Sequence, residues 1–254
     1  MCAEYNLKTS ERELSVLLDV SILNQTNDQE WNRHVRLYGR APVIYEHQGQ
    51  VVIEEMQFSL LPPGSRISFS ANTRLDDWDE RKGLILAFER PLWREAFLRR
   101  RCVVPVSEFI EPIYIGMHEG QMMGFFDPDS PIIFIAGIYQ ETLDVKTGEI
   151  FKGFSVLTDF AHPFVQATGH HRTVITLPPQ AALEWIKARP IEGRWGIEFL
   201  MRNKDQLNLD THPVRTMKNW KSRVATSIEK ARHEEHVRPR IEAARQDWIA
   251  KNSK

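Results

Sequence analysis

Short apolar runs separated by turn residues fill the middle of the chain, and they constrain its fold more than any other feature. The runs span residues 42–45, 51–53, 56–60, 67–69, 102–106, 109–114, 122–126, 132–139, 150–157 and 173–177. The first two are joined by His47-Gln48-Gly49-Gln50, which is typical of a hairpin turn. Strands at this spacing favour an antiparallel sheet or a partly closed barrel over repeated βαβ units. The sequence therefore predicts an α+β fold, rich in antiparallel strands, with flanking helices.

Helix signals lie around these runs. A capping box at residues 10–13 precedes Leu14, Leu17, Leu18 and Ile22, which recur with helical spacing. We expect this helix to pack on the core, with residues 1–9 as an arm before it and a polar loop at residues 24–34. Further helices are expected after prolines that suit a first helical turn, at Pro91, Pro163 and Pro178-Pro179.

The composition changes at about Lys221, where charged residues surround a narrow apolar stripe. This favours two regions, a catalytic domain over residues 1–220 and a charged helical extension over residues 221–254. Pro239 is expected to begin a second helix within the extension. Such a stripe docks on its own domain or on a protein partner more often than on nucleic acid.

Charge and cysteine content narrow the function. With 33 Lys and Arg against 34 Asp and Glu, the net charge is −1, so any anionic partner must be held by a local patch. The chain opens MCAEYNLKTSER without a signal-peptide pattern, and no stretch is long and apolar enough to span a membrane. We expect a cytoplasmic protein, associated with the nucleoid if bacterial. Two cysteines argue against a disulfide framework or a zinc site, and we expect no metal or cofactor.

Cys2 becomes the chain terminus if Met1 is trimmed, which the small size of the second residue favours. A terminal α-amine has a pKa of roughly 7.7–8.0, so about a quarter to a half is unprotonated near pH 7.5, against about 0.1 % of a lysine. The amine can then attack an aldehyde, and the adjacent thiol can add to the imine to close a thiazolidine ring. Taken alone, a cysteine in this position is more often incidental.

Three polar residues, Asn72, Glu111 and His170, sit at or just beyond the ends of expected strands, where β scaffolds present functional groups. Each alone is more often a turn residue, a surface carboxylate or a loop histidine. Their order after Cys2 is what suggests a shared site.

Six motifs in order carry a resemblance to a known family. They are Met1-Cys2-Ala3-Glu4, Phe58-Ser59-Leu60-Leu61-Pro62, Asn72-Thr73-Arg74, the block from Arg101 to Pro112, Phe134-Ile135-Ala136-Gly137-Ile138-Tyr139 and His170-His171-Arg172-Thr173-Val174. Together they resemble the SOS-response-associated peptidase (SRAP) family, whose members crosslink to abasic sites in single-stranded DNA. The resemblance covers residues 1 to about 220, and the block at Arg101–Pro112 is its most specific part.

The resemblance implies a role for each residue. Cys2 would be the nucleophile and covalent attachment point, Asn72 would orient its amine or thiol, and Glu111 and His170 would move protons. Arg74 and Arg172 would contact phosphates as cations. Arg101 and Phe58, which lie in motifs that match the family, would be further DNA contacts. The partner would be single-stranded DNA with abasic sites.

The motifs also depart from the family pattern. Glu4 stands where the family has arginine and adds a negative charge beside the site. Phe58 and Pro112 stand where the family has tryptophans that stack on bases, each such contact contributing about 1–3 kcal/mol. Either the chain is a divergent member with altered DNA preference, or the covalent chemistry persists on a different substrate, and we favour the first.

Two other classes of function fit Cys2 or the arginines. An N-terminal cysteine hydrolase would also use the free amine as base and the thiol as nucleophile, and would show amide turnover. A non-catalytic DNA-binding protein would bind reversibly, with an affinity that falls steeply with salt.

Overall fold

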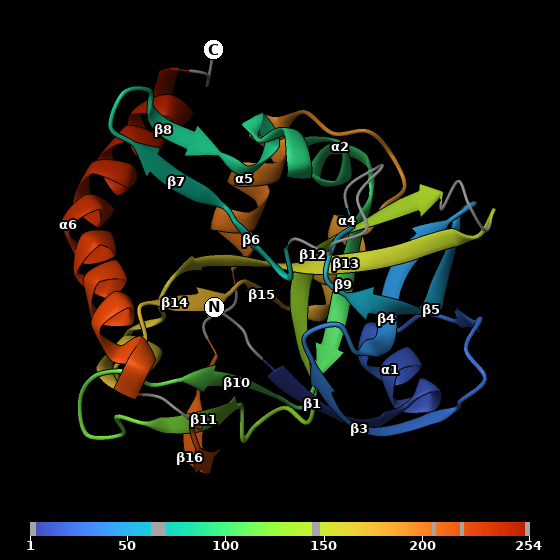
Figure 1. Ribbon diagram of the computed structural model, residues 1–254. Helices are drawn as coiled ribbons and strands as arrows, with labels where there is room; N and C mark the ends of the chain where they lie inside the picture. Colours follow the sequence, from blue (N-terminus) through green and yellow to red (C-terminus); the bar gives the residue numbers. More distant parts are fainter. Residues whose placement is uncertain (1–3, 62–69, 144–147, 205–206, 219–220, 252–254) are drawn as a thin grey trace.

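The computed structural model describes residues 4–61, 70–143, 148–204, 207–218 and 221–251 (Figure 1). The strands are β1 (Glu4–Ser10), β2 (Ile22–Asn24), β3 (Glu30–Arg36), β4 (Arg40–His47), β5 (Gln50–Phe58), β6 (Asn72–Arg74), β7 (Asp76–Asp79), β8 (Gly83–Leu86), β9 (Arg101–Val106), β10 (Glu108–Pro112), β11 (Gln121–Phe126), β12 (Ile133–Leu143), β13 (Ile150–Phe160), β14 (Arg172–Val174), β15 (Thr176–Leu177) and β16 (Asp210–Thr216). The helices are α1 (Glu11–Leu18), α2 (Pro91–Arg99), α3 (Pro163–Ala167), α4 (Pro179–Trp185), α5 (Gly193–Asn203) and α6 (Lys221–Lys251), with a 3₁₀ turn, η1, at Ala87–Glu89.

Five strands close into a barrel. Antiparallel pairing runs from β13 through β12, β9 and β4 to β5, and a parallel pairing of β5 with β13, with Phe58 opposite Phe154, completes the ring. A second sheet, in the order β16-β11-β10-β1-β3, lies beside it. The predicted α+β, barrel-like and mainly antiparallel fold is confirmed.

Both faces of the barrel strands are buried. One face packs with Tyr5, Phe109 and Phe125 of the second sheet, through residues that include Val43, Val52, Val104, Ile135 and Val156. The alternate residues pack under helices α1, α2, α4 and α5: Ile44, Ile53, Val103, Ala136 and Leu157. Double burial explains the uninterrupted apolar runs of the sequence, because neither face needs polar residues. Each fully buried Phe, Leu or Ile side chain contributes about 1.5–3 kcal/mol to folding.

The N-terminal segment differs from the prediction. Residues 4–10 form β1 instead of an arm, and part of the expected loop at residues 24–34 belongs to β3, which pairs with β1 along its whole length. Trp31 and Val35 are buried while the intervening residues face outward or are only partly covered. Because the outward side chains of β3 are polar, its apolar content is low and its alternation is easily taken for a loop.

Three other expectations are corrected. The expected strand at residues 173–177 is divided into β14 and β15 around Ile175, and helix α1 ends before Ile22, which lies in β2. Pro239 starts no new helix, because α6 continues through it. Val237 and Ile241, on either side of this proline, are both buried against Phe160, which holds the helix in place despite the missing N–H group. The expected strand at residues 67–69 lies outside the described residues.

Helix α6 packs along one side of the molecule, beside β7 and β8 (Figure 1). Arg245 near its end forms ion pairs with Asp76 at 2.6 Å and Asp159 at 3.2 Å, and all three side chains are buried. Burial raises the pKa of Asp76 to about 6, with Asp159 adding to the rise. Burial also acts against ionisation of Asp159, but the charges of Lys204, Arg245 and Arg172 outweigh it and lower the pKa of this carboxyl. Within the described ranges, no helix combines the length and apolar content needed to cross a membrane.

The capping box of α1 gives a first test of the fold. Ser10 Oγ accepts from the backbone N–H of Glu13, and the Glu13 carboxylate accepts from the backbone N–H of Ser10. We expect Ser10→Ala to lower the free energy of unfolding by about 1 kcal/mol, because a helical N–H loses its partner. Urea denaturation measures this change. Ser15→Ala, inside the same helix, is the control, and an equal loss in both variants would contradict the capping role.

Candidate active site

A groove of about 910 Å³ lies between the ends of β6 and β10, the loop before β14 and helix α6. The side chains on its barrel side include Asn72, Arg74, Pro112, His170 and His171. Those contributed by α6 are Thr226, Ser227, Glu229, Lys230, His233 and Glu234. Residues from both regions predicted in the sequence therefore border one cavity.

Glu111 and His170 form a buried pair at this groove. Glu111 Oε2 lies 3.5 Å from His170 Nε2, with the two side chains 0 % and 2 % exposed. Burial raises the pKa of Glu111 to about 7, because a carboxylate is poorly solvated there. Burial also lowers the pKa of His170 well below its usual value, and the neighbouring His171 and Arg172 add to this effect. Near neutral pH the pair therefore combines a carboxyl that can still hold its proton with a neutral imidazole.

The backbone selects the imidazole tautomer. His170 Nδ1 lies 3.0 Å from the carbonyl oxygen of Pro112. A carbonyl oxygen can only accept, so Nδ1 carries the proton and donates it, which leaves the Nε2 lone pair facing Glu111. The carboxyl of Glu111 and the Nε2 lone pair of His170 thus face each other as an acid and a base. This arrangement suits general acid and base catalysis at neutral pH.

Asn72 is positioned by the barrel. It starts β6, which pairs in parallel with β13, and Asn72 lies opposite Val156. The carbonyl oxygen of Asn72 accepts from Ser70 Oγ at 2.8 Å, which fixes the backbone at the start of the strand. The Asn72 side chain is half-buried and lines the groove, as does His170. Three of the four residues predicted to share a site are thus brought to one place.

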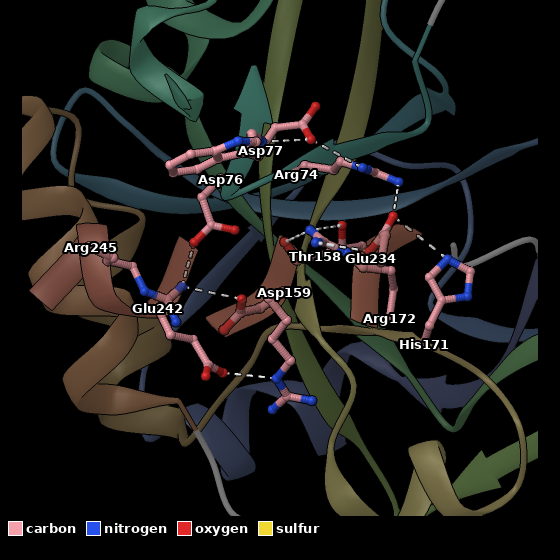
Figure 2. Close-up of polar contacts among 12 residues, drawn as sticks. Arg74, Asp76, Asp77, Thr158, Asp159, His171, Arg172, Glu234, Glu242 and Arg245 are labelled. Atoms are coloured by element: carbon pink, nitrogen blue, oxygen red, sulfur yellow. Dashed lines mark hydrogen bonds and ion pairs between the residues drawn. The ribbon is translucent and has the colours of Figure 1, made fainter. Parts of the chain in front are cut away.

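The two predicted phosphate-binding arginines also lie together, and both contact Glu234 of helix α6 (Figure 2). Arg172 Nη1 is 3.5 Å from Glu234 Oε2, and Arg74 donates to the other oxygen. His171 Nε2 is 3.7 Å from Glu234 Oε1. Burial lowers the pKa of His171 to about 4, although Glu234 acts to raise it, so this imidazole is neutral near pH 7. The site is therefore an anion site that already holds a carboxylate.

Two of the predicted DNA contacts are wrong. Phe58 is 0 % exposed and stacks on Phe154 with ring centroids 5.1 Å apart, so it has no surface to offer a base. Arg101 is also buried, and its guanidinium donates to the backbone carbonyl oxygens of Leu98, Trp185, Lys187 and Arg189. Burial lowers the pKa of Arg101 to about 10, and the side chain serves the fold by holding the end of α4.

The charge of Glu4 is compensated. Its carboxylate lies 2.7 Å from His34 Nε2 and 3.8 Å from Arg36, and it accepts from Arg215. Partial burial acts to raise the pKa of Glu4, but hydrogen bonds and positive charge from Arg215 and His34 outweigh it and lower the pKa. Glu4 is consequently ionised and paired, which offsets much of the repulsion that the sequence suggested for an anionic ligand.

The remaining site residues complete the description. Cys2 lies outside the described residues. Cys102 is fully buried, and burial raises the pKa of its thiol well above the usual value, so it is inert as a nucleophile. Over the described part of the chain, no group of three or more His, Cys, Asp or Glu side chains is arranged to hold a metal. Sequence reasoning missed His171, Tyr114 and Glu234 as groove residues. The adjacent motif could have indicated His171, whereas nothing in the sequence distinguishes Glu234 from its neighbours.

The raised pKa of Glu111 predicts a pH-dependent stability. The folded state holds this proton up to about pH 7, whereas the ordinary value is 4.5. The stabilising contribution is therefore complete below about pH 4.5 and is lost as the pH rises through 7. Glu111→Gln removes the buried carboxylate. The difference in free energy of unfolding between this variant and the wild type should therefore shift by about 2 kcal/mol in favour of the variant from pH 5 to pH 8. Urea denaturation across this range measures the gap. Exposed Glu119→Gln is the control substitution, and a constant gap for Glu111→Gln would refute the raised pKa.

Comparisons with known proteins identify the family and the fold. Residues 1–220 match the model of the family described as SOS response associated peptidase (SRAP). A solved structure of a protein from Bacteroides thetaiotaomicron has the same fold, with a TM-score of 0.63, 22 % identity, and coverage of 84 % of this chain and 92 % of that one. A protein from Bordetella bronchiseptica aligns with a TM-score of 0.62 and 16 % identity over 84 % of this chain and 100 % of its own. A phage-related protein from the same organism gives 0.58 and 18 % over 85 % and 95 %. No curated protein matched the sequence. The fold, the motifs and the match over residues 1–220 together mean that the chain belongs to the SOS response associated peptidase family.

Proposed function

We propose that this protein senses abasic sites in single-stranded DNA and crosslinks to them through Cys2, with a thiazolidine as the product. The observation that carries the proposal is the buried Glu111–His170 pair beside Asn72 in the groove. It supplies proton transfer near neutral pH, as condensation of an amine with an aldehyde requires. The crosslink would protect the lesion during the response to DNA damage.

The position of Cys2 in the chain supports this reaction. Glu4 starts β1 and pairs with Ile110, the neighbour of Glu111. Consecutive Cα atoms are 3.80 Å apart, so the Cα atom of Cys2 is within roughly 7.6 Å of that of Glu4. The chain therefore limits how far Cys2 can lie from Glu4, whose strand partner Ile110 precedes Glu111.

The proposed chemistry balances without an external reagent. After Met1 is removed, the free amine of Cys2 attacks C1′ of the ring-opened deoxyribose, and a carbinolamine forms. Loss of its hydroxyl as water gives an imine, and addition of the thiol across the C=N bond closes the thiazolidine ring. Glu111 in its protonated form donates to the leaving hydroxyl, while neutral His170 accepts protons at Nε2. Asn72 has both donor and acceptor groups with which to orient the amine or the thiol.

The first test is crosslinking itself. Mixed with single-stranded DNA that contains one abasic site, the purified protein should form a species that survives denaturing electrophoresis, and its intact mass should lack Met1. Cys2→Ala should abolish the species because the thiol that closes the thiazolidine ring is lost, and the imine that the remaining α-amine can form is hydrolysed. Cys102→Ala is the matched control and should crosslink normally, since that thiol is buried. A normal yield of the crosslinked species from Cys2→Ala would contradict the mechanism.

The second test separates the proton carriers. Glu111→Gln should slow crosslinking at least about tenfold, because general acid–base groups typically contribute 10²–10⁴-fold. His170→Ala should alter the rate of formation or of reversal. Rates are measured by quenching samples over time, with Glu119→Gln as the control at an exposed site. Unaltered kinetics in both Glu111→Gln and His170→Ala would show that these roles are misassigned.

The family description also names a peptidase, and the same groups suit an N-terminal cysteine hydrolase. That alternative predicts amide turnover by the wild type and no covalent species with abasic DNA. The two outcomes are read in the same preparation, so the assay separates them.

A further inference from the structure

The anion site formed by Arg74 and Arg172 is filled by a side chain of the same molecule. Glu234 is 4 % exposed and Arg172 is 1 % exposed, and Glu234 contacts both arginines (Figure 2). A carboxylate and a phosphodiester each carry one negative charge and present oxygen acceptors to guanidinium groups in the same way. Glu234 thus satisfies the cations that an incoming phosphate would need.

A phosphate cannot simply be added to this cluster. Arg74, Arg90 and Arg172 face two carboxylates, since Asp77 lies 3.4 Å from Arg74 and 2.6 Å from Arg90. A further anion at Arg74 and Arg172 would lie beside the buried carboxylate of Glu234. Two neighbouring negative charges repel each other strongly where water is scarce. Access of a phosphate therefore requires Glu234 to leave.

The helix that carries Glu234 is held differently along its length. Around and beyond Pro239 it is anchored by Val237 and Ile241 on Phe160 and by the ion pairs of Arg245. Before Pro239, its residues from Thr226 to Glu234 line the groove. Pro239 has no N–H group, so the backbone hydrogen-bond ladder is weakened between the covering half and the anchored half.

The helix also lies outside the shared part of the family. The family match ends at residue 220 and α6 begins at Lys221, so the cover is an addition to a site whose other residues belong to the matched region.

We propose that Glu234 is an internal competitor for DNA: its carboxylate occupies the position of a substrate phosphate, and the covering half of α6 must leave the groove before single-stranded DNA reaches Asn72 and His170. This regulation rests on the proposed function, because it assumes that the groove is the DNA site. Removal of the Glu234 charge strengthens DNA binding and speeds crosslinking.

The test compares two substitutions on adjacent residues. Glu234→Gln and Glu235→Gln change the net charge equally, but Glu235 is exposed. Binding of a fluorescent single-stranded oligonucleotide without abasic sites is measured by anisotropy. Glu234→Gln should bind at least about fivefold more tightly than Glu235→Gln, in the usual range of coupling between sites. Equal affinities, or weaker binding by Glu234→Gln, would overturn the proposal.

A second measurement uses the unmodified chain and does not depend on how the variants fold. Hydrogen–deuterium exchange of residues 226–238 should accelerate when the oligonucleotide is added, while that of residues 241–249 should stay unchanged. Unchanged or slower exchange in residues 226–238 would also overturn the proposal.

The two proposals fail separately. Crosslinking to abasic DNA with no effect of Glu234→Gln would support the proposed function and contradict the proposed regulation. Tighter DNA binding by Glu234→Gln without any covalent species would support the competition by Glu234 and contradict the crosslinking chemistry.

Discussion

The hydrogen bonding of strand β13 is the constraint on which both the barrel and the site depend. Besides its antiparallel partner β12, β13 closes the barrel through β5 and then, at its far end, pairs with β6 and β14. Its last residues set the site: Thr158 lies opposite Arg74 on one side, and Phe160 lies opposite Arg172 on the other. The two arginines are therefore brought to a common position by one strand between them. Asp159, between these two residues, anchors α6 through Arg245.

The strands of the barrel were predictable because burial on both faces leaves long apolar runs, and the first helix because its cap is local. The strands β1 and β3 were not, since a half-solvated strand has few apolar residues and Trp31 and Val35 are widely spaced. The same double burial explains the error at Phe58 and Arg101. A motif aligns a position with its relatives, but only the packing around Phe154 and α4 decides whether the side chain faces solvent.

The candidate site was predictable as a set of residues but not as a geometry. Glu111 and His170 are far apart in the chain, and their approach depends on the loop that joins α3 to β14 and on the carbonyl oxygen of Pro112. Their shifted pKa values follow mainly from that burial, with His171 and Arg172 adding to the shift of His170. Glu234 could not be predicted at all, because α6 carries many charged residues and only its docking selects the one that meets the arginines.

The compensation of charge at this site bears on how it can meet an anionic ligand. With a net charge of −1, the chain has no global field to attract DNA, and the arginines of the groove are already neutralised by Glu234 and Asp77. A free arginine that binds a phosphate releases condensed counterions and makes binding strongly salt-dependent. An arginine that exchanges Glu234 for a phosphate instead frees a carboxylate, which attracts cations of its own. Under the proposed function, binding at this site would exchange one anion for another, and selectivity would come from the covalent step and not from the strength of the electrostatic attraction.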